Sequence, residues 1–338
     1  MRCLPGGKCA LGCAVLRKAD LLHFVAWRAR FAGRARRCYP PAMHPRVKAA
    51  GDAILAWLAG AVFAGLRGLG LRRASALGGA VLRALGPFTP RHKRVMANLA
   101  LAFPERDADW RRAVALDAWE NLGRTACEYV HLAELAASAE MSPESQAALA
   151  RLRADPRPKL AMAAHLANWE VPAVIMHAAG ERSGIIYRTP NNARIAEMVR
   201  AMREPIMGRL IPATLAAPRS IHAMLRDGVG IGMLIDQHFS RGMRVEFMGA
   251  DVLANPLIAQ LAARYGIAVY GMRAVRLPDG GLRAVLEGPY DLPEDIPGAV
   301  QAMNDIIARW VREHPGDWLW MHRRWRDLPA RPDPAPPG

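Results

Sequence analysis

His165 and Glu170 are separated by four residues and lie in a polar stretch between two apolar segments. The first segment, 160–164, predicts a short strand. The second has Pro172 near its start and Gly180 at its end, as expected for a helix with proline in its first turn and glycine just after its last. Because α/β proteins place binding and catalytic residues where a strand hands over to a helix, we take this junction as the candidate site.

A histidine beside a carboxylate could act as a general base. Residues five apart on an ideal helix point about 140° away from each other. His165 and Glu170 can therefore meet only if the histidine precedes the helix and the glutamate lies in its first turn. A carboxylate bonded to one ring nitrogen fixes the tautomer and raises the basicity of the other nitrogen. The spacing alone fits a structural His–Glu pair at a helix start equally well.

The charge of the chain is concentrated at one end. The net charge is +16 over 338 residues, and residues 1–50 supply +10 of it, with eleven Lys/Arg against one acidic residue. The remaining body is mildly basic, which suits anionic lipid headgroups or an acidic protein partner as well as nucleic acid. Confinement of the excess to this segment weakens the nucleic-acid interpretation. We expect no metal and no nucleotide cofactor, because zinc-finger spacing, a P-loop, G-x-G-x-x-G and H-E-x-x-H are all missing.

Residues 1–42 read as a basic extension, either an arm for a membrane surface or a segment upstream of the true start at Met43. Residues 53–66 carry no charge and are flanked by arginine and lysine. A full membrane span needs about 20 apolar residues, so this stretch is short unless the helix runs on to Leu71. We favour a membrane anchor within 43–75, spanning or interfacial, and the alternative is a buried core helix.

The rest of the chain predicts one α/β domain over 76–330, followed by a disordered tail at 331–338. A helical section at 92–137 precedes apolar runs that alternate with helical segments, which indicates a mixed, mainly parallel sheet flanked by helices. A turn at 278–281 predicts an antiparallel edge hairpin. The expected strands are 160–164, 184–188, 230–235, 267–276 and 282–287, and the expected helices are 171–179, 193–204, 219–227, 253–265 and 298–313.

Five spaced motifs resemble those of the bacterial lipid A biosynthesis acyltransferases. His165-Leu-Ala-Asn-Trp-Glu170 is similar to the family's H-x4-[DE] signature, which usually reads close to H-F-G-N-W-E. Further similar segments follow the family's order and cover roughly residues 50–328; they are Asn98-Leu99 to Phe103-Pro104, Tyr187-Arg188 with Asn191-Asn192, Leu234-Ile-Asp236-Gln237, Val245-Glu-Phe-Met-Gly249, and Trp318 to Trp325.

The resemblance implies a fold like that of the glycerol-phosphate acyltransferases and transfer of a fatty acyl chain from an acyl-carrier protein thioester to a hydroxyl of a lipid A precursor. His165 would be the general base and Glu170 would orient it. Arg188 would hold a phosphate or stabilise the oxyanion, unless it is a plain surface arginine. Asp236 would orient Arg188 or another cation rather than act as a second base. The other expected substrate-binding residues are Asn191, Arg219 and Gln237.

We expect the protein at the cytoplasmic face of the inner membrane, with the acidic acyl-carrier protein and a lipid as its partners and no nucleic acid. A close alternative is another lipid acceptor, such as a lysophospholipid, a glycolipid or an ornithine lipid. A distant alternative is a non-catalytic basic protein that binds membranes or nucleic acid. Acyl chain length, acceptor position and oligomeric state have no signal in the sequence.

Overall fold

The computed structural model describes residues 45–326, with side chains from residue 51 onward. The chain divides into a unit of residues 1–50, of which the helical residues 45–50 are described, and a unit of residues 51–338. The predictions for residues 1–42 and 331–338 therefore lie outside the described residues.

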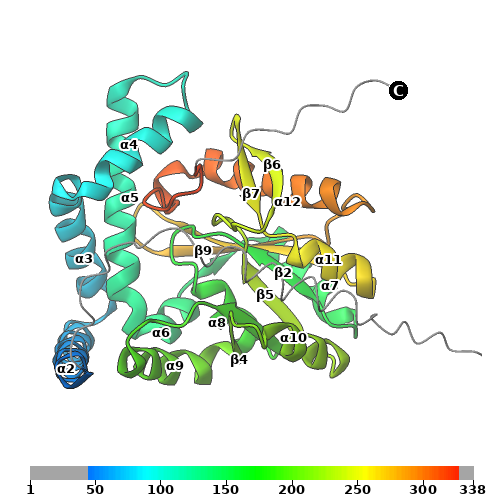
Figure 1. Cartoon of the computed structure of the whole chain (residues 1–338), viewed down its shortest axis with the longest axis horizontal. Coiled ribbons are helices and arrows are strands. Elements are labelled where there is room, and N and C mark those ends of the chain that lie inside the picture. The colour runs from blue at the N-terminus through cyan, green and yellow to red at the C-terminus, as the bar shows by residue number, and fades with distance from the viewer. Residues whose placement is uncertain (1–44, 327–338) are drawn as a thin grey trace, which may run out of the picture. The chain divides into compact units, whose positions relative to one another are not determined.

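A seven-stranded sheet forms the centre of this unit (Figure 1). The strand order is β1-β9-β8-β2-β5-β3-β4; β8 and β9 are antiparallel and the other neighbours are parallel. The predicted mixed, mainly parallel sheet is thus confirmed. The strands are β1 (Glu140–Met141), β2 (Leu160–Ala163), β3 (Ser183–Tyr187), β4 (Arg209–Pro212), β5 (Gly230–Leu234), β8 (Val269–Arg276) and β9 (Leu282–Glu287).

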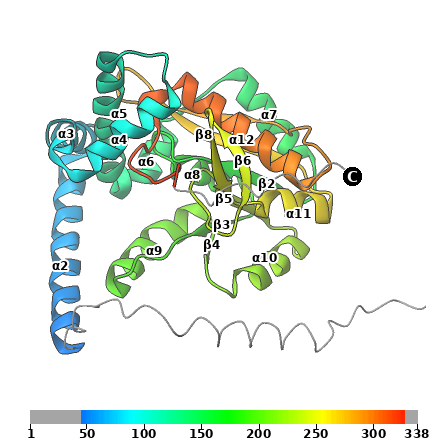
Figure 2. The same ribbon diagram turned by 45° about the horizontal axis from the view of Figure 1, so that its top comes forward.

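Helices cover both faces of the sheet, as parallel strands require. Figure 2 shows the same arrangement from a second direction. One face carries α7 (Pro143–Ala154), α8 (Val171–Ala178) and α9 (Ala193–Met207), and the other carries α10 (Ala217–Arg226), α11 (Leu257–Tyr265) and α12 (Ile296–Glu313). The helical section before the sheet consists of α3 (Leu71–Leu85), α4 (Pro90–Ala102), α5 (Ala108–Glu128) and the short α6 (Leu132–Ala137).

Two details of the sheet differ from the sequence prediction. The turn at 278–281 joins β8 to β9, but β9 is not an edge strand because the two-residue β1 pairs with it. The helix expected from residue 253 begins only at Leu257. Residues before it form β7 (Ala250–Ala254), which pairs with β6 (Met243–Phe247) in a separate hairpin. Met248 and Gly249 turn this hairpin with φ of 51° and 86°, the positive values that a tight two-residue turn needs.

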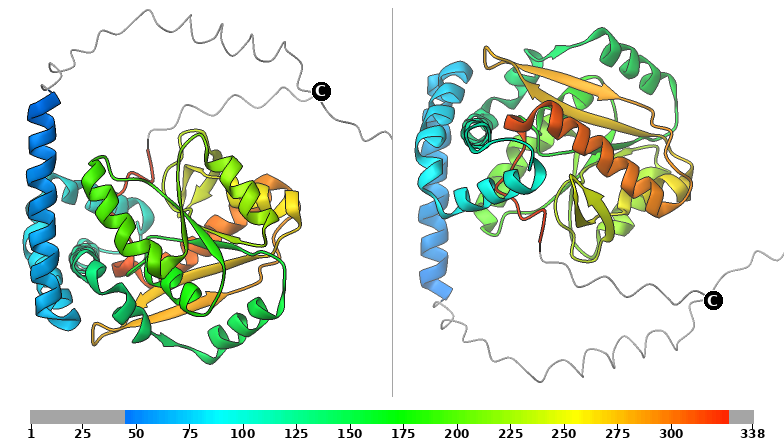
Figure 3. Two further views of the ribbon diagram at one scale, coloured as in Figure 1. Left: turned by 90° about the horizontal axis from the view of Figure 1, so that it is seen from below. Right: turned by 90° about the horizontal axis from the view of Figure 1, so that it is seen from above.

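The apolar segment near the start forms most of α2 (Pro45–Leu69). Gly51–Leu69 has a mean hydropathy of 1.4 and is long and apolar enough to cross a membrane, yet only 11% of the window is buried. Trp57, for example, is 71% exposed. A buried core helix, the alternative, is therefore wrong. Figure 3 shows α2 running past α9, where the Asn192 side-chain amide donates to the Asp52 carbonyl oxygen at 3.1 Å.

The Trp-rich segment near the C-terminus belongs to the core. Trp318 and Trp320 are buried and meet edge to face, with ring centroids 4.7 Å apart. Arg324 is fully buried over the Phe247 ring, while Arg323 is exposed. Because these two tryptophan rings are packed inside the domain, they are not available to lipid headgroups.

Candidate active site

The candidate site lies at the carboxyl ends of the parallel strands β2 and β5, which are central in the sheet. His165 follows the carboxyl end of β2, and α8 begins six residues later with Pro172 in its first turn. Asp236 and Gln237 follow the carboxyl end of β5. Since β2 and β5 pair directly, with Ala163 opposite Leu234, the two polar segments are brought side by side. The predicted strand–turn–helix around His165 is thus confirmed.

His165 is bonded to Asp236 twice. The ring Nδ1 lies 2.8 Å from Oδ1 of Asp236, and the backbone N–H of His165 donates to Oδ2 at 2.9 Å. The Trp318 indole N–H also donates to Oδ2, at 2.8 Å. An ionised carboxylate accepts all three bonds, so the ring carries its proton on Nδ1 and leaves a lone pair on Nε2. This is the tautomer that a general base requires.

Charge and burial support the same assignment. The Asp236 side chain is only 2% exposed, and burial alone would raise its pKa. The bonds from His165 and Trp318 outweigh burial and hold the pKa of Asp236 below its usual range, so the carboxyl is ionised at neutral pH. The His165 side chain is 13% exposed, and its Nε2 lies 3.1 Å from the side-chain nitrogen of Gln237. The Trp169 ring lies against the imidazole, with centroids 5.1 Å apart.

Glu170 has a different partner from the one expected. The Arg203 guanidinium, from α9, donates to its Oε2 at 2.6 Å, and both side chains are buried. Burial raises the pKa of the Glu170 carboxyl, while Arg203 opposes the shift. The hydrogen bond that would orient His165 is therefore made by Asp236 and not by Glu170. We expected Asp236 to orient Arg188 or another cation. Arg188 is wrong as the partner, because the carboxylate is already occupied by His165 and Trp318.

The other expected substrate-binding residues emerge at the same edge of the sheet. Arg188 and Asn191 follow the carboxyl end of β3, and Arg219 lies in the first turn of α10, after β4. All three are exposed, and the side chain of none of them makes a hydrogen bond or ion pair with another described residue. Of the predicted set, the structure brings His165, Asp236 and Gln237 into direct contact. The roles of Arg188, Asn191 and Arg219 in binding remain predictions.

A buried carboxylate holds the loop that carries His165. Glu128, at the end of α5, is fully buried and accepts from the side-chain amide of Asn168 at 3.0 Å and from the hydroxyl of Ser75 at 2.7 Å. Arg276, at the end of β8, forms an ion pair with it. The Asn168 side-chain oxygen in turn accepts the backbone N–H of Glu170 at 3.2 Å. No spacing in the sequence pointed to Glu128 or Arg276, since their partners lie 40 to 148 residues away.

The backbone of the loop is also fixed by the C-terminal segment. Leu319 N–H donates to the His165 carbonyl oxygen at 3.1 Å, and Ala167 N–H donates to the Asp317 carbonyl oxygen at 2.9 Å. Ala167 has a φ of 44°, a left-handed conformation that costs a residue with a side chain about 1 kcal/mol. Arg324 donates to the Gln237 carbonyl oxygen at 2.7 Å and so holds the second polar segment. The site is thus positioned by contacts from distant parts of the chain.

A cysteine nucleophile has no support in this geometry. Cys127, the only cysteine after residue 38, lies in α5 where α3 and α5 approach closely. Burial, together with the neighbouring Glu128 carboxylate, raises the pKa of its thiol. The thiol therefore stays protonated at neutral pH and is a poor nucleophile.

A histidine paired with a buried aspartate, at the carboxyl ends of the strands of a mainly parallel sheet, has the geometry that general-base catalysis needs. The family model described as bacterial lipid A biosynthesis acyltransferase matches residues 42–327. The chain therefore belongs to the bacterial lipid A biosynthesis acyltransferase family, and the protein is an acyltransferase. A search of curated proteins found no match for this chain.

Proposed function

We propose that the protein transfers a fatty acyl group from an acyl-carrier protein thioester to a hydroxyl of a lipid A precursor, at the cytoplasmic face of the inner membrane. The observation that carries the proposal is the Nδ1–Oδ1 distance of 2.8 Å between His165 and the buried Asp236. It leaves Nε2 of the ring as an acceptor for the proton of a hydroxyl. Family membership supports the acyl transfer, and the exposed apolar face of α2 supports the membrane.

The reaction needs no covalent enzyme intermediate. As the acceptor hydroxyl gives its proton to Nε2 of His165, its oxygen attacks the thioester carbonyl carbon. The tetrahedral intermediate then collapses, the C–S bond breaks, and the proton passes from His165 to the leaving thiolate. The products are an ester and the free thiol of the carrier. General-base catalysis of this kind contributes about 10²–10⁴-fold in rate.

Asp236 and Glu170 have different parts in this proposal. Asp236 fixes the tautomer of His165 and stabilises the imidazolium that forms during the attack. Glu170 lies close enough for its charge to interact with that of His165, and it acts through space while it remains bonded to Arg203. Its contribution to catalysis is therefore electrostatic, because Arg203 holds its carboxylate away from direct contact with the reacting atoms.

Gln237 occupies the position from which a substrate hydroxyl would approach. Its amide nitrogen lies 3.1 Å from Nε2 of His165, so the hydroxyl must displace it before the proton can be transferred. The amide is then free to donate to the oxyanion that develops on the thioester carbonyl. The exposed Arg188 and Arg219 on the same edge provide positive charge for the phosphates of the acceptor or for the acidic carrier protein.

Two measurements test the proposal. The purified full-length protein in lipid nanodiscs is given acyl-carrier protein loaded with a fatty acid and a lipid A precursor, and the ester product is quantified by mass spectrometry. We expect His165→Ala to lower the rate at least about 10³-fold, and the exposed His177→Ala on α8 to leave it unchanged. Equal activity of both variants and the unchanged protein would refute the general base. No acyl transfer by the unchanged protein would instead favour a non-catalytic binder.

The acceptor is tested in cells. Lipid A from cells with and without the gene is compared by mass spectrometry, and we expect one secondary acyl chain to disappear with the gene. An unchanged lipid A profile, together with His165-dependent acylation of a lysophospholipid, glycolipid or ornithine lipid, would reassign the acceptor and leave the chemistry intact.

A further inference from the structure

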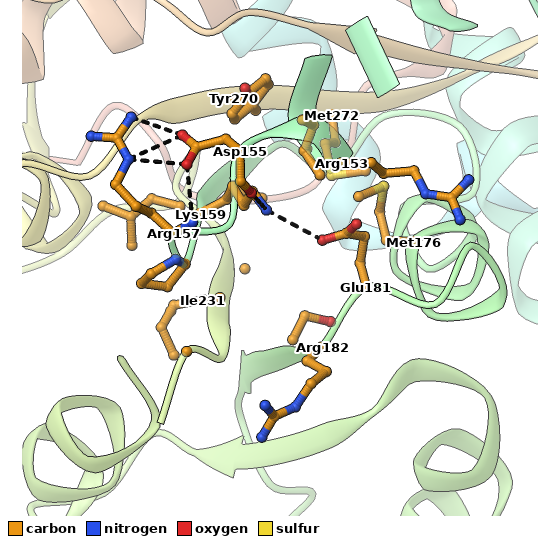
Figure 4. A pocket seen from close by; sticks show the side chains of 18 of the residues that line it. Arg153, Asp155, Arg157, Lys159, Met176, Glu181, Arg182, Ile231, Tyr270 and Met272 are labelled. Atoms are coloured by element: carbon orange, nitrogen blue, oxygen red, sulfur yellow. Dashed lines mark hydrogen bonds and ion pairs between the residues drawn. The ribbon is translucent and has the colours of Figure 1, made fainter. Parts of the chain in front are cut away.

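A cavity lies at the amino ends of the parallel strands, opposite to the end that carries His165 (Figure 4). Its volume is about 370 Å³, within the range of small-molecule sites. It is lined by the first residues of β2, β3 and β5, by the connector 155–159 and by α8. Because these strands are parallel and His165 follows the end of β2, the cavity and the candidate active site lie at opposite ends of the same strands.

The floor of this cavity is apolar. Leu160, Met176, Ile231, Tyr270 and Met272 line it, and each is at least nine-tenths buried in the domain. Figure 4 shows Met176, Tyr270 and Met272 on one side of the hollow and Ile231 on the other. A ligand that reaches this floor replaces water against hydrocarbon and aromatic surface, which favours an apolar group at that end.

The rim of the cavity is charged, with more basic than acidic groups. Arg157 donates four hydrogen bonds to the Asp155 carboxylate, three from its guanidinium at 2.8 to 3.2 Å and one from its backbone N–H at 2.9 Å. Lys159 lies 3.7 Å from the Glu181 carboxylate, which faces it across the hollow in Figure 4. Both acidic side chains of the rim are therefore already paired with cations.

Two further arginines of the rim have no acidic side chain as a partner among the described residues. Arg153, at the end of α7, and Arg182, just before β3, are exposed and line the cavity. Among residues 51–326, the side chain of neither arginine makes a hydrogen bond or an ion pair, although the Arg182 carbonyl oxygen accepts from the Gly230 N–H at 2.8 Å. The rim thus has an excess of positive charge that an anion would neutralise, and arginine binds carboxylates and phosphates in a two-pronged geometry.

We propose that this cavity is a second ligand site, which takes a small amphipathic anion with its carboxylate or phosphate bound by Arg153 and Arg182 and its apolar tail on Met176 and Met272. In Figure 4 the guanidinium groups of both exposed arginines point away from the hollow, so both side chains turn inward when the anion binds. The site is independent of acyl transfer at His165, since its lining residues include none of the loop 164–170 and neither Asp236 nor Gln237. This proposal and the proposed function are therefore independent, and failure of one would leave the other unaffected.

Calorimetric titration of the full-length protein in nanodiscs of neutral lipid tests the proposal with four probes. Hexanoate and hexyl phosphate carry both a charge and a tail, inorganic phosphate has no tail, and hexanol has no charge. We expect saturable binding of hexanoate or hexyl phosphate, and the tighter of the two identifies the preferred anion. Binding of inorganic phosphate or hexanol as tight as that of both amphipathic probes would overturn the proposal.

Variants of the lining residues test whether the anion binds in this cavity. The double change Arg153→Ala with Arg182→Ala should weaken binding at least about tenfold, because two charged contacts are lost. Arg226→Ala, an exposed arginine at the end of α10, is the matched control and should bind as the unchanged protein does. Ala173→Leu, which adds bulk to the α8 wall, should also weaken binding. Undiminished binding by the double variant would refute the site.

A photoreactive derivative of hexanoate separates this site from the active site directly. After irradiation and proteolysis, we expect labelled peptides from 152–161 and 176–185, and the same labelling in the His165→Ala variant. Labelling confined to residues 164–170 and 236–237 would show that the anion binds at the catalytic edge and would overturn the proposal.

Discussion

Replacement of Asp236 by asparagine should disable His165 without disturbing the fold. Two donors, the His165 backbone N–H and the Trp318 indole N–H, converge on Oδ2 of Asp236. An asparagine keeps its single oxygen there, because its amide group cannot accept their hydrogens. The amide nitrogen then faces Nδ1 of the ring, which must present a lone pair to it. The ring proton moves to Nε2, and the atom that should accept the substrate proton is blocked.

The magnitude follows from this tautomer change. General-base assistance is lost in full, and the imidazolium loses its counter-charge, so kcat should fall about 10³–10⁴-fold. The KM for the lipid acceptor should change only a few-fold, since Asp236 is buried beneath the imidazole and does not face solvent. Steady-state rates with acyl-carrier protein thioester and lipid acceptor measure both values, and circular dichroism verifies the fold.

Glu170→Gln provides the comparison that separates the two carboxylates. The amide oxygen of the variant can still accept from Arg203, and only the negative charge near His165 is lost, so kcat should fall about 10–100-fold. The Asp236→Asn variant should therefore be at least about tenfold slower than Glu170→Gln. If Glu170→Gln abolishes transfer while Asp236→Asn stays within tenfold of the unchanged protein, the pairing of His165 with Asp236 is not the catalytic one.

Three further predictions concern stability, measured by urea unfolding of the full-length protein in a non-ionic detergent. Ala167→Val should lower the free energy of unfolding by more than about 2 kcal/mol, because a β-branched residue is strained at φ 44°. Ala167→Gly should change it by no more than about 1 kcal/mol. Equal losses in the two variants would refute the left-handed conformation of residue 167. Gly123→Ala should lower the free energy of unfolding by about 1–3 kcal/mol, since its methyl group would collide with the carbonyl of Gly78. Gly65→Ala is the control and should not lower it, because the added methyl group meets no atom within 4 Å. Burial raises the pKa of Asp317 to about 6, so its ionisation lowers the stability of the fold as pH rises from about 4 to 6. Asp317→Asn should remove this loss, so its free energy of unfolding should exceed that of the unchanged protein by a margin that grows to about 3 kcal/mol between pH 4 and 6. A margin independent of pH would contradict the assignment.

Much of the sheet could be predicted because its strands are buried on both faces and read as short apolar runs. β2, β5 and β8 all lie within the ranges expected for them. The edge strand β4 was not predicted, since only one of its four residues is buried and its pattern is weak. The hairpin β6–β7 was missed because its second strand runs almost directly into α11, so that the apolar pattern resembled one longer helix.

The partner of His165 could not be predicted from spacing. Asp236 lies 71 residues further along the chain, and β3 and β4 intervene between β2 and β5 in sequence. Only the strand order places β5 directly beside β2 and so brings the two polar segments together. The sequence did indicate both halves of the site, since one apolar strand is followed by His165 and another by Asp236 and Gln237. What it lacked was the adjacency of those strands, which depends on the whole sheet.

The helical section before the sheet contributes to the site through a chain of buried contacts. Ser75 on α3 donates to Glu128 on α5, and Glu128 accepts from Asn168 in the loop that follows His165. A buried carboxylate is costly unless it is fully paired, and removal of one partner leaves an uncompensated charge. Arg276 supplies the countercharge from the end of β8. The loop is therefore held by α3, α5 and the sheet together, so a disturbance of the N-terminal helices should reach His165 through Glu128.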